Sequence, residues 1–349
     1  MFGFGSSRTI VGLDIGSSSI KAVELKKVKG EIQVAHLGME RLGSDIVVDS
    51  MIVDSGSVSS AISKLFSERK FGSKLVATAV SGHSVIVKKI SMQTVPESEV
   101  PELLQTEAAQ YIPFDMNDVN IDYQVLSENA NEPQMDVLLA AVKKDKILNY
   151  TNVLSLSGKI PEVVDIDAFA LQNCYEYNYE PSPTSTVALL NIGASVMNIN
   201  IVKGSTPLFT RDVSVGGNQY TDSLQKELDL SFDDAEALKM GETIGKVSPD
   251  AKLPILKQVT EIIVLEIQKT FDFFRATAAG SHIEKIYLAG GSSAVPGLTE
   301  ALRQEFSMPV EILNPFQRIQ ANGAGDFVGE NAGQLAVAVG LALRSFESL

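Results

Sequence analysis

Three short runs of glycine, serine and alanine are candidates for binding phosphate, because each follows an apolar run that is typical of a β-strand. Their backbone N–H groups and hydroxyls carry no bulky side chain, so anionic oxygens can approach the backbone closely. The first two runs are near-repeats, Leu-Asp-Ile-Gly-Ser-Ser and Leu-Asn-Ile-Gly-Ala-Ser, which predicts two matching lobes that grip one polyphosphate. The third run is expected to hold a base and sugar. In chain order the runs are Gly16, Ser17, Ser18 and Ser19; Gly193, Ala194 and Ser195; and Gly290, Gly291 and Ser292.

Charged residues beside the first run favour a phosphate with a metal ion. Asp14 ends an apolar strand, where a buried carboxylate needs a counter-ion. A hydrated Mg²⁺ that bridges the phosphates would supply it, because magnesium keeps most of its waters and uses few carboxylates. Lys21, on the next expected strand, can reach the β- and γ-phosphates as a point charge. The alternatives are a tight hairpin turn at the glycine-serine run and a turn cap at Asp14.

Two further glycines, Gly216 and Gly217, precede an expected helix over residues 218–228 and would let the backbone approach a nucleotide. An ordinary helix-start turn is the alternative here, as a strand-to-helix turn is at the third run. Taken together, the runs predict a nucleoside polyphosphate with magnesium as the ligand.

The composition fits a globular protein of two or more subdomains, because 349 residues exceed one ordinary core. A net charge of −14 argues against broad nucleic-acid binding, which needs a positive surface. Cys174 is the only cysteine, so the chain can form no intrachain disulfide. The first eight residues lack the apolar core of a signal peptide, and no stretch reaches the length of a membrane span. We therefore expect a cytoplasmic protein with no direct membrane span.

The order of expected elements divides the chain into two similar halves and an insertion. Both halves begin with three strands and two turns. Residues 82–163 instead follow a strand–helix–strand–strand–helix order, which predicts a separate α+β module. A long amphipathic helix is expected over residues 253–275 and a small-residue helix over 332–346. The predicted subdomains are a first lobe of residues 1–81, 164–185 and 332–349, the insertion at 82–163, a second lobe of 186–225 and 276–331, and a helical part at 226–275.

This loop order resembles that of the actin, Hsp70 and sugar-kinase ATPase superfamily, and the match extends over nearly the whole chain. The first and second runs, with Asp14, Lys21 and Asn191, resemble its two phosphate motifs, and the third run resembles its adenosine motif. The resemblance implies an α/β, actin-like ATPase fold of two duplicated lobes that binds ATP. It also implies that residues 82–163 form an inserted FtsA-type α+β subdomain.

Within that superfamily, four strings are similar to those of the PilM family of type IV pilus assembly proteins, at residues 80–87, 107–115, 163–171 and 211–217. The resemblance implies a cytoplasmic ATP-binding adaptor that binds the N-terminal cytoplasmic tail of a PilN-like inner-membrane protein. Through this partner it would be peripheral at the inner membrane. Pilus ATPases and self-association are further partner predictions.

The same resemblance implies a groove for an extended peptide in the insertion, with strand addition or side-chain pockets as the recognition mode. Glu102, Glu107 and Asp115 are candidates to meet a basic residue of the tail. The alternative for the apolar residues of this region is an ordinary core.

The superfamily resemblance also assigns roles to four residues. Asn191 stands where the pattern commonly has a second Asp, and an amide adds no charge near Mg²⁺, so we expect slow or no ATP hydrolysis. Asp167, at the start of an expected helix, would position the attacking water, and the alternative is an N-cap of that helix. Glu236 and Lys239 resemble the adenosine-contacting pair, and the alternative is a solvated ion pair three residues apart.

Two other functions occur on this fold. A small-molecule kinase would need a catalytic carboxylate that faces an acceptor pocket, and the insertion and Asn191 argue against it. An FtsA-like filament-forming protein is expected to end in a basic amphipathic helix that binds membranes, whereas this sequence ends with Arg344 as a single terminal base.

Overall fold

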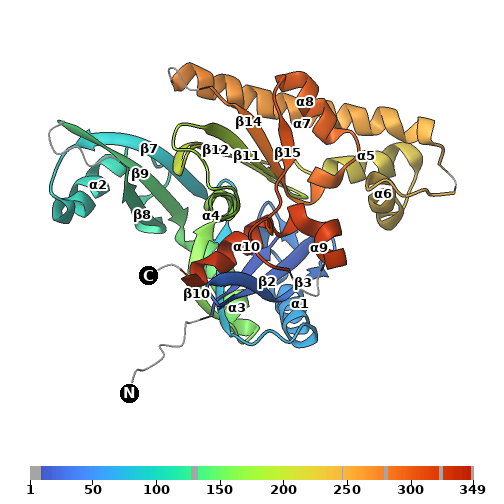
Figure 1. Ribbon diagram of the computed structural model, residues 1–349, viewed down its shortest axis with the longest axis horizontal. Helices are drawn as coiled ribbons and strands as arrows, with labels where there is room; N and C mark the ends of the chain where they lie inside the picture. The colour runs from blue at the N-terminus through green and yellow to red at the C-terminus, as the bar shows by residue number, and fades with distance from the viewer. Residues whose placement is uncertain (1–8, 127–132, 246, 279–281, 322–324, 347–349) are drawn as a thin grey trace.

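The computed structural model describes residues 9–126, 133–245, 247–278, 282–321 and 325–346, so the N-terminal segment discussed above lies outside it. Two five-stranded sheets and the helices packed on them form an α/β core, and a three-stranded sheet projects from this core (Figure 1). Among the described residues, no helix has both the length and the apolar character needed to cross a bilayer.

The first large sheet combines a β-meander with two crossover strands, in the order β10-β6-β1-β2-β3. Strands β1, β2 and β3 pair antiparallel, β6 runs parallel to β1, and β10 runs parallel to β6. Helix α1 (Ser55–Glu68) packs on this sheet because its apolar residues recur every three or four positions. The strands are β1 (Val11–Ile15), β2 (Ser19–Val28), β3 (Glu31–Arg41), β6 (Leu75–Val80) and β10 (Ile160–Ile166).

The second large sheet repeats this plan, in the order β13-β12-β11-β14-β15. Its first three strands also form an antiparallel meander, and β14 runs parallel to β11. Asn191 lies opposite Asn198 at the end of its first hairpin, as Asp14 lies opposite Lys21 in the first sheet. The repeat confirms the prediction of two similar halves. The strands are β11 (Thr186–Ile192), β12 (Met197–Lys203), β13 (Thr206–Val213), β14 (Lys285–Ala289) and β15 (Val310–Ile312).

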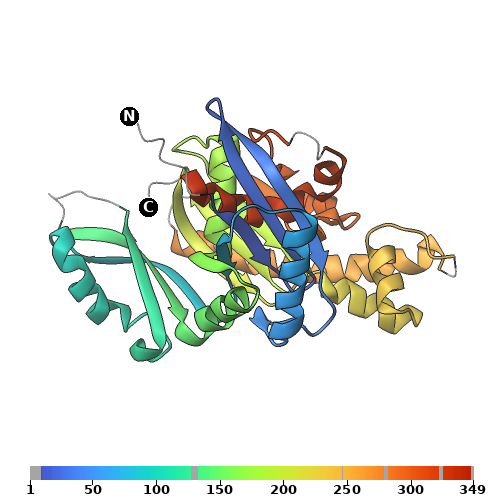
Figure 2. The same ribbon diagram turned by 90° about the horizontal axis from the view of Figure 1, so that it is seen from below.

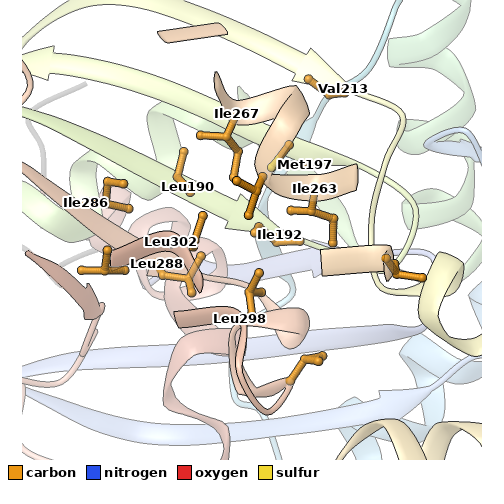
Figure 3. Close-up of a cluster of buried hydrophobic side chains, with 14 of the residues drawn as sticks. Leu190, Ile192, Met197, Val213, Ile263, Ile267, Ile286, Leu288, Leu298 and Leu302 are labelled. Carbon is orange, nitrogen blue, oxygen red and sulfur yellow. The ribbon is translucent and has the colours of Figure 1, made fainter. Parts of the chain in front are cut away.

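A large apolar core joins the second sheet to its helices (Figure 3). Ile192 and Met197 of the sheet lie with Ile263 and Ile267 of the long helix α7 (Pro249–Thr277) in this core. Helix α7 extends beyond the predicted residues 253–275 at both ends. The other helices of this half are α5 (Asn218–Leu228), α6 (Phe232–Lys239) and α8 (Leu298–Phe306).

Two helices, α4 (Asp167–Tyr179) and α10 (Ala336–Leu343), share one apolar core with strands of both large sheets. A β-carbon at Gly340 would lie 1.7 Å from the carbonyl oxygen of Ala170. Only glycine therefore allows α10 to pack this closely on α4. This packing places the first residue of α4, Asp167, at the junction of the two halves.

The prediction of one continuous helix over residues 332–346 is wrong at both ends. Short 3₁₀ turns, Ala332–Leu335 and Arg344–Phe346, flank α10, and α9 (Gly325–Asn331) precedes them. At the C-terminal end, Arg344 forms an ion pair with Asp165 at 2.7 Å. Ser345 exchanges hydrogen bonds with the Ile10 backbone. These side-chain contacts hold the chain in a tighter turn than an α-helix.

The insertion has a sheet in the order β7-β9-β8 and an apolar core of its own. Figure 2 shows it at one end of the molecule, with α6 and the start of α7 at the opposite end. Its elements are β7 (Val85–Gln93), a 3₁₀ turn (Glu97–Glu99), α2 (Val100–Ala108), a second 3₁₀ turn (Met116–Asp118), β8 (Val119–Val125) and β9 (Gln134–Lys143). The helix that follows, α3 (Lys144–Leu156), packs its apolar residues into the core of the first sheet.

A short hairpin between the first sheet and α1 was not predicted from the sequence. Its strands, β4 (Val47–Val48) and β5 (Met51–Ile52), have two residues each, so they carry no recognisable alternation. The turn residues Asp49 and Ser50 both have positive φ, 48° and 60°. Such a turn is usually built from Asn and Gly, so its composition gave no signal.

Candidate functional site

The first glycine-serine run forms the turn between β1 and β2. The Gly16 N–H donates to the Ser19 carbonyl at 3.1 Å, which closes the turn and leaves Ser18 exposed. Across the hairpin, the Asp14 carboxylate and the Lys21 ammonium lie 3.2 Å apart, and only 15% and 12% of these side chains are exposed. Each buried charge is thus stabilised by the other. The turn offers a carboxylate to a cation and an ammonium to a phosphate at one place.

The second hairpin carries amides where the first carries charges. The Asn191 side-chain amide donates to Asn198 Oδ1 at 2.8 Å, and the Asn198 amide donates to Asp212 Oδ1 at 2.8 Å. The other carboxylate oxygen of Asp212 accepts the Gly82 backbone N–H at 2.6 Å. Because Gly82 follows β6 of the first sheet, the Asp212 carboxylate links the two halves of the molecule.

Sequence reasoning missed Asp212, although it lies within the string at residues 211–217. The signal that identified Asp14 was also present here, because Asp212 is a carboxylate near the end of a strand. Burial raises the pKa of Asp212, and hydrogen bonds from Asn198 and Gly82 oppose that rise. The second lobe thus has a carboxylate, but on β13 rather than on the strand that precedes the loop.

Asp167 is the first residue of α4 and lies near both Asp14 and Asp212. Burial, followed by the negative charge of Asp14, raises the pKa of Asp167 to about 7, and a hydrogen bond with the Ser81 side chain opposes the rise. The alternative that Asp167 caps α4 is wrong, because Ile166 occupies the cap position and no side chain caps this helix. A carboxyl group with this pKa can exchange a proton with water at neutral pH.

Lys146 of α3 is a second residue that sequence reasoning missed. It is only 1% exposed, its ammonium donates to the Ser50 carbonyl, and it lies 4.9 Å from the centre of the Tyr150 ring. Burial lowers the pKa of Lys146 to about 8, and the charges of Asp167 and Asp212 oppose this shift. The available signal was its spacing, because Lys146 occupies the same buried helix face as Tyr150.

The carbonyl oxygen of Gly193 links three glycine-containing loops of the second half through hydrogen bonds. It accepts the Gly217 backbone N–H at 2.9 Å and the Ser292 hydroxyl at 3.0 Å. A β-carbon at Gly216 would lie 2.5 Å from the carbonyl oxygen of Ala194, so no larger residue fits there. The second run, the Gly216–Gly217 turn and the third run are therefore locked into one unit.

The third run crosses the end of β11. Gly290 has a φ of +88°, and a β-carbon on it would lie 2.4 Å from the Ile192 carbonyl oxygen. Both observations require glycine at this position. Gly291 follows in a 3₁₀ turn, and Ser195 of the second run accepts a hydrogen bond from Asn218 at 3.2 Å. The backbone of these loops is thus fixed before any ligand binds.

Glu236 and Lys239 lie next to this unit on α6. Their carboxylate and ammonium groups are 2.5 Å apart, and Lys239 also donates to the Thr221 hydroxyl at 3.1 Å. Lys239 is buried, with 7% of its side chain exposed, whereas Glu236 retains 30%. The alternative of a solvated ion pair therefore does not hold for Lys239. Thr221 also hydrogen-bonds Glu236, which fixes both side chains against α5.

The predicted residues thus lie in two groups. One group surrounds Asp14 at the first hairpin, and the other surrounds Gly193 in the second half. Asp167 and Asp212 connect the groups, because Asp167 interacts electrostatically with Asp14, and Asp212 is hydrogen-bonded to Asn198.

The donor set fits a hydrated magnesium ion better than a bare one. Within the part of the chain that the structure describes, no three His, Cys, Asp or Glu side chains form a group that could hold a metal ion directly. Burial raises the pKa of Asp167 most, and the nearby carboxylates of Asp14 and Asp212 raise it further, so three carboxyl groups lie close together here. Magnesium that arrives with phosphates and keeps its waters would balance this charge without direct protein ligands.

Comparisons with known proteins agree with this geometry. A family model described as type IV pilus assembly protein PilM matches residues 12–346. The solved PilM-PilN type IV pilus biogenesis complex is 25% identical to this chain, with a TM-score of 0.88. The match covers 98% of this chain and 100% of that chain.

More distant likenesses concern the fold. The cell division protein FtsA of Streptococcus pneumoniae serotype 2 (strain D39) is 23% identical over 370 residues, which cover 93% of this chain and 80% of that protein. The crystal structure of MreB 5 of Spiroplasma citri bound to AMPPNP has 13% identity and a TM-score of 0.53, and covers 96% of this chain and 95% of that chain. These matches confirm the predicted actin-like ATPase fold.

Proposed function

Because the chain belongs to the PilM family of type IV pilus assembly proteins, we propose that it is an ATP-binding adaptor of the pilus assembly machinery. ATP with Mg²⁺ binds between the two halves, and the insertion binds the N-terminal cytoplasmic tail of a PilN-like inner-membrane protein. The protein itself is cytoplasmic and reaches the inner membrane through that tail. The observation that carries the nucleotide part is the locking of three glycine loops around Gly193 in the second half, together with the Asp14–Lys21 pair at the hairpin of the first half.

In this proposal the two groups of residues hold different parts of the nucleotide. Lys21 and the backbone of residues 16–19 bind the β- and γ-phosphates, and Asp14 holds Mg²⁺ through water. The loops around Gly193 and Gly290 face the phosphates and adenosine from the second half. Glu236 and Lys239 contact the ribose or base, for which their fixed geometry on α6 is suited.

ATP hydrolysis is slow or absent in this proposal. The Asn191 amide is already used by Asn198, and it carries no charge to stabilise a metal-bound water. Asp167 remains to position the attacking water, with its pKa raised to about 7. The protein would then act mainly through differences in ATP affinity between its open and closed states.

Calorimetric titration of ATP into the full chain tests the nucleotide part, with and without Mg²⁺. We expect binding with Mg²⁺ and markedly weaker binding when EDTA removes it. The melting temperature should rise with ATP–Mg²⁺, because a ligand that binds only the folded state stabilises it. No heat of binding and no change in melting temperature at millimolar ATP would overturn this part.

A hollow in the insertion supports the partner part of the proposal. Its volume is about 620 Å³, and it combines apolar, acidic and basic side chains. Asp115 lies in its wall, whereas Glu102 and Glu107, the other acidic candidates, are not among the residues that line it. The lining residues are Pro113, Phe114, Asp115, Asp118, Lys143, Lys144, Asp145 and Leu148. Such a mixture suits a peptide with an apolar anchor and a charged neighbour.

Leu148 provides a sharp test, because its side chain is 56% exposed while it lines the hollow. Leu148→Gln should weaken binding of a synthetic PilN-like tail peptide about tenfold, since one apolar anchor is lost. Leu253→Gln is the matched control, because Leu253 is also 56% exposed on a helix but lies on α7. Fluorescence anisotropy of the labelled peptide measures both. Equal binding by the two variants would remove the hollow as the tail site.

A further inference from the structure

Helix α3 has two functional faces at its N-terminal end. Lys144, Asp145 and Leu148 line the hollow of the insertion. Lys146, Asn149 and Tyr150 lie on the opposite side and contact the β4–β5 hairpin. The two sets alternate along the same two turns, so a displacement of the first set necessarily moves the second.

The contacts of α3 with the hairpin are unusually complete. The Asn149 side chain accepts the Ile52 N–H at 3.0 Å and donates to the Ile52 carbonyl at 2.9 Å. The Ser50 carbonyl accepts hydrogen bonds from both the Tyr150 hydroxyl, at 3.0 Å, and the Lys146 ammonium. Because three side chains hold two backbone positions of the hairpin, Ser50 in its turn and Ile52 in β5, the hairpin must follow α3.

The hairpin in turn contacts Ser81, whose neighbours include acidic residues of the nucleotide site. The Ser50 hydroxyl lies 3.4 Å from the Ser81 hydroxyl, and Ser81 hydrogen-bonds the Asp167 side chain. The next residue, Gly82, donates its N–H to Asp212 at 2.6 Å. A shift of the turn at Ser50 would therefore change the position of both Asp167 and Asp212.

We propose that α3 couples the tail-binding hollow to the nucleotide site, with Lys146, Asn149 and Tyr150 as positioning residues that act through the β4–β5 hairpin. This inference rests on the proposed function and adds its regulation. A tail peptide in the hollow holds α3 against the hairpin and so fixes Ser81 and Asp167 in the arrangement that binds ATP–Mg²⁺. Pre-organisation of this kind raises ATP affinity. Linkage requires that ATP raises tail affinity by the same factor.

The test measures ATP–Mg²⁺ affinity of the full chain by calorimetry, with and without saturating synthetic tail peptide. We expect the peptide to tighten ATP binding at least about fivefold, the lower end of typical coupling factors. The same factor should appear when the peptide is titrated with and without saturating ATP–Mg²⁺. An unchanged or weaker ATP affinity in the presence of bound peptide would overturn the proposal.

Two substitutions on α3 form a matched pair. Asn149→Ala removes both bonds to Ile52 and should bring the coupling factor close to one, while each ligand still binds alone. Asn152→Ala, one turn further on, changes an exposed side chain outside the hollow and should keep the full factor. A purely structural role of Asn149 would lower the melting temperature without changing the coupling factor, and that result would contradict the proposal.

Lys146→Met and Tyr150→Phe extend the test, because each removes one hydrogen bond to the Ser50 carbonyl and keeps most of the side-chain volume. Both should reduce the coupling factor, and retention of the full factor by both would overturn the proposal. Binding of each ligand alone to the unaltered chain distinguishes a failure of the proposed function from a failure of the coupling. If either ligand fails to bind, the proposed function is wrong and this inference falls with it. If both bind independently, only the coupling is wrong.

Discussion

The two hairpins that begin the two large sheets share one register but differ in charge. In the first, Asp14 faces Lys21, and in the second, Asn191 faces Asn198. The first hairpin end is therefore an ion pair, and the second is a pair of amides that are hydrogen-bonded to each other. The two hairpins therefore share the same backbone pairing, but only the first has charged side chains that can attract a metal ion and phosphate.

The carboxylate of the second half comes instead from the third strand, as Asp212 on β13. Asn198 and the Gly82 N–H hold its two oxygens, so it has less freedom to bind a ligand than Asp14. The difference suggests a division of roles. In the proposed function, the first hairpin would supply charge to the ligand, and the second would align the two halves through the Gly82–Asp212 bond.

The largest effect of this unequal charge should appear in the pH dependence of stability. Asp167 has a pKa of about 7, raised from 3.8 by burial and then by Asp14. Between these values the folded chain keeps a proton that the unfolded chain has released. The contribution of Asp167 to stability is therefore largest below pH 4 and is lost as pH rises to about 7, by on the order of 4 kcal/mol at 1.36 kcal/mol per unit. Denaturant unfolding at pH 4.5 and 8 measures this loss.

Asp167→Asn is the variant for this comparison, because an amide resembles the protonated carboxyl group in shape and charge. It should be more stable than the unaltered chain at pH 8 and gain little at pH 4.5. Asp14→Asn should flatten part of the pH dependence, since the Asp14 charge is the second cause of the raised pKa of Asp167. If stability changed with pH in the same way in all three proteins, neither Asp167 nor the Asp14 charge would cause the pH dependence.

The next largest effect is expected on ligand affinity at the first hairpin. Asp14→Asn should weaken ATP–Mg²⁺ binding by about 1.5–3 kcal/mol, the usual contribution of a hydrogen bond to a charged group. The dependence on Mg²⁺ should fall at the same time, because the carboxylate is the metal's partner in the proposal. Calorimetric titration checks both, with Asp250→Asn as the control in an exposed position on α7. Equal losses in the two variants would remove Asp14 from the site.

A smaller effect is expected at Asp212. Asp212→Asn should weaken ATP–Mg²⁺ binding by about 1 kcal/mol, because an amide oxygen can still accept one of the two hydrogen bonds. The loss should be similar with and without Mg²⁺, since the role of this residue is alignment. A loss confined to titrations with Mg²⁺ would instead show that Asp212 acts on the metal, and the two hairpins would then differ less than proposed.

Site residues that were predicted from the sequence have partners in neighbouring loops, whereas those that were missed have partners far along the chain. The glycine runs were recognisable because Gly216 and Gly290 meet backbone atoms of neighbouring loops, a requirement that glycine itself signals. Lys146 and Asp212 bind partners 96 and 130 positions away. The local signals, a position near a strand end for Asp212 and on a buried helix face for Lys146, do not reveal such distant partners, so the contribution of these residues to the site became visible only in the folded chain.

Helices and strands with a local sequence pattern could likewise be predicted, and those without one could not. The two meanders and the insertion could be predicted because their strands are apolar or alternating runs between turn residues and their helices show a period of 3.6. The β4–β5 hairpin could not, because its two-residue strands have no period and its turn residues, Asp49 and Ser50, have an uncommon conformation. Contacts from α3, far along the chain, hold this hairpin in place.

The smallest effect on affinity, and the most direct test of the comparison, is expected from Asn191→Asp, which restores a carboxylate to the second hairpin. ATP–Mg²⁺ affinity should change by less than about 0.5 kcal/mol, because the new charge attracts Mg²⁺ but repels Asp212, to which Asn198 links it. The rate of ATP hydrolysis should rise, because a carboxylate can stabilise a metal-bound water that an amide cannot. Phosphate release measures that rate, with Asn120→Asp, in an exposed position on β8, as the control. If hydrolysis stays as slow as in the unaltered chain, the amide at position 191 is not what limits it. The difference between the two hairpins would then affect only how the two halves are aligned, and Asp167 would be the next residue to substitute.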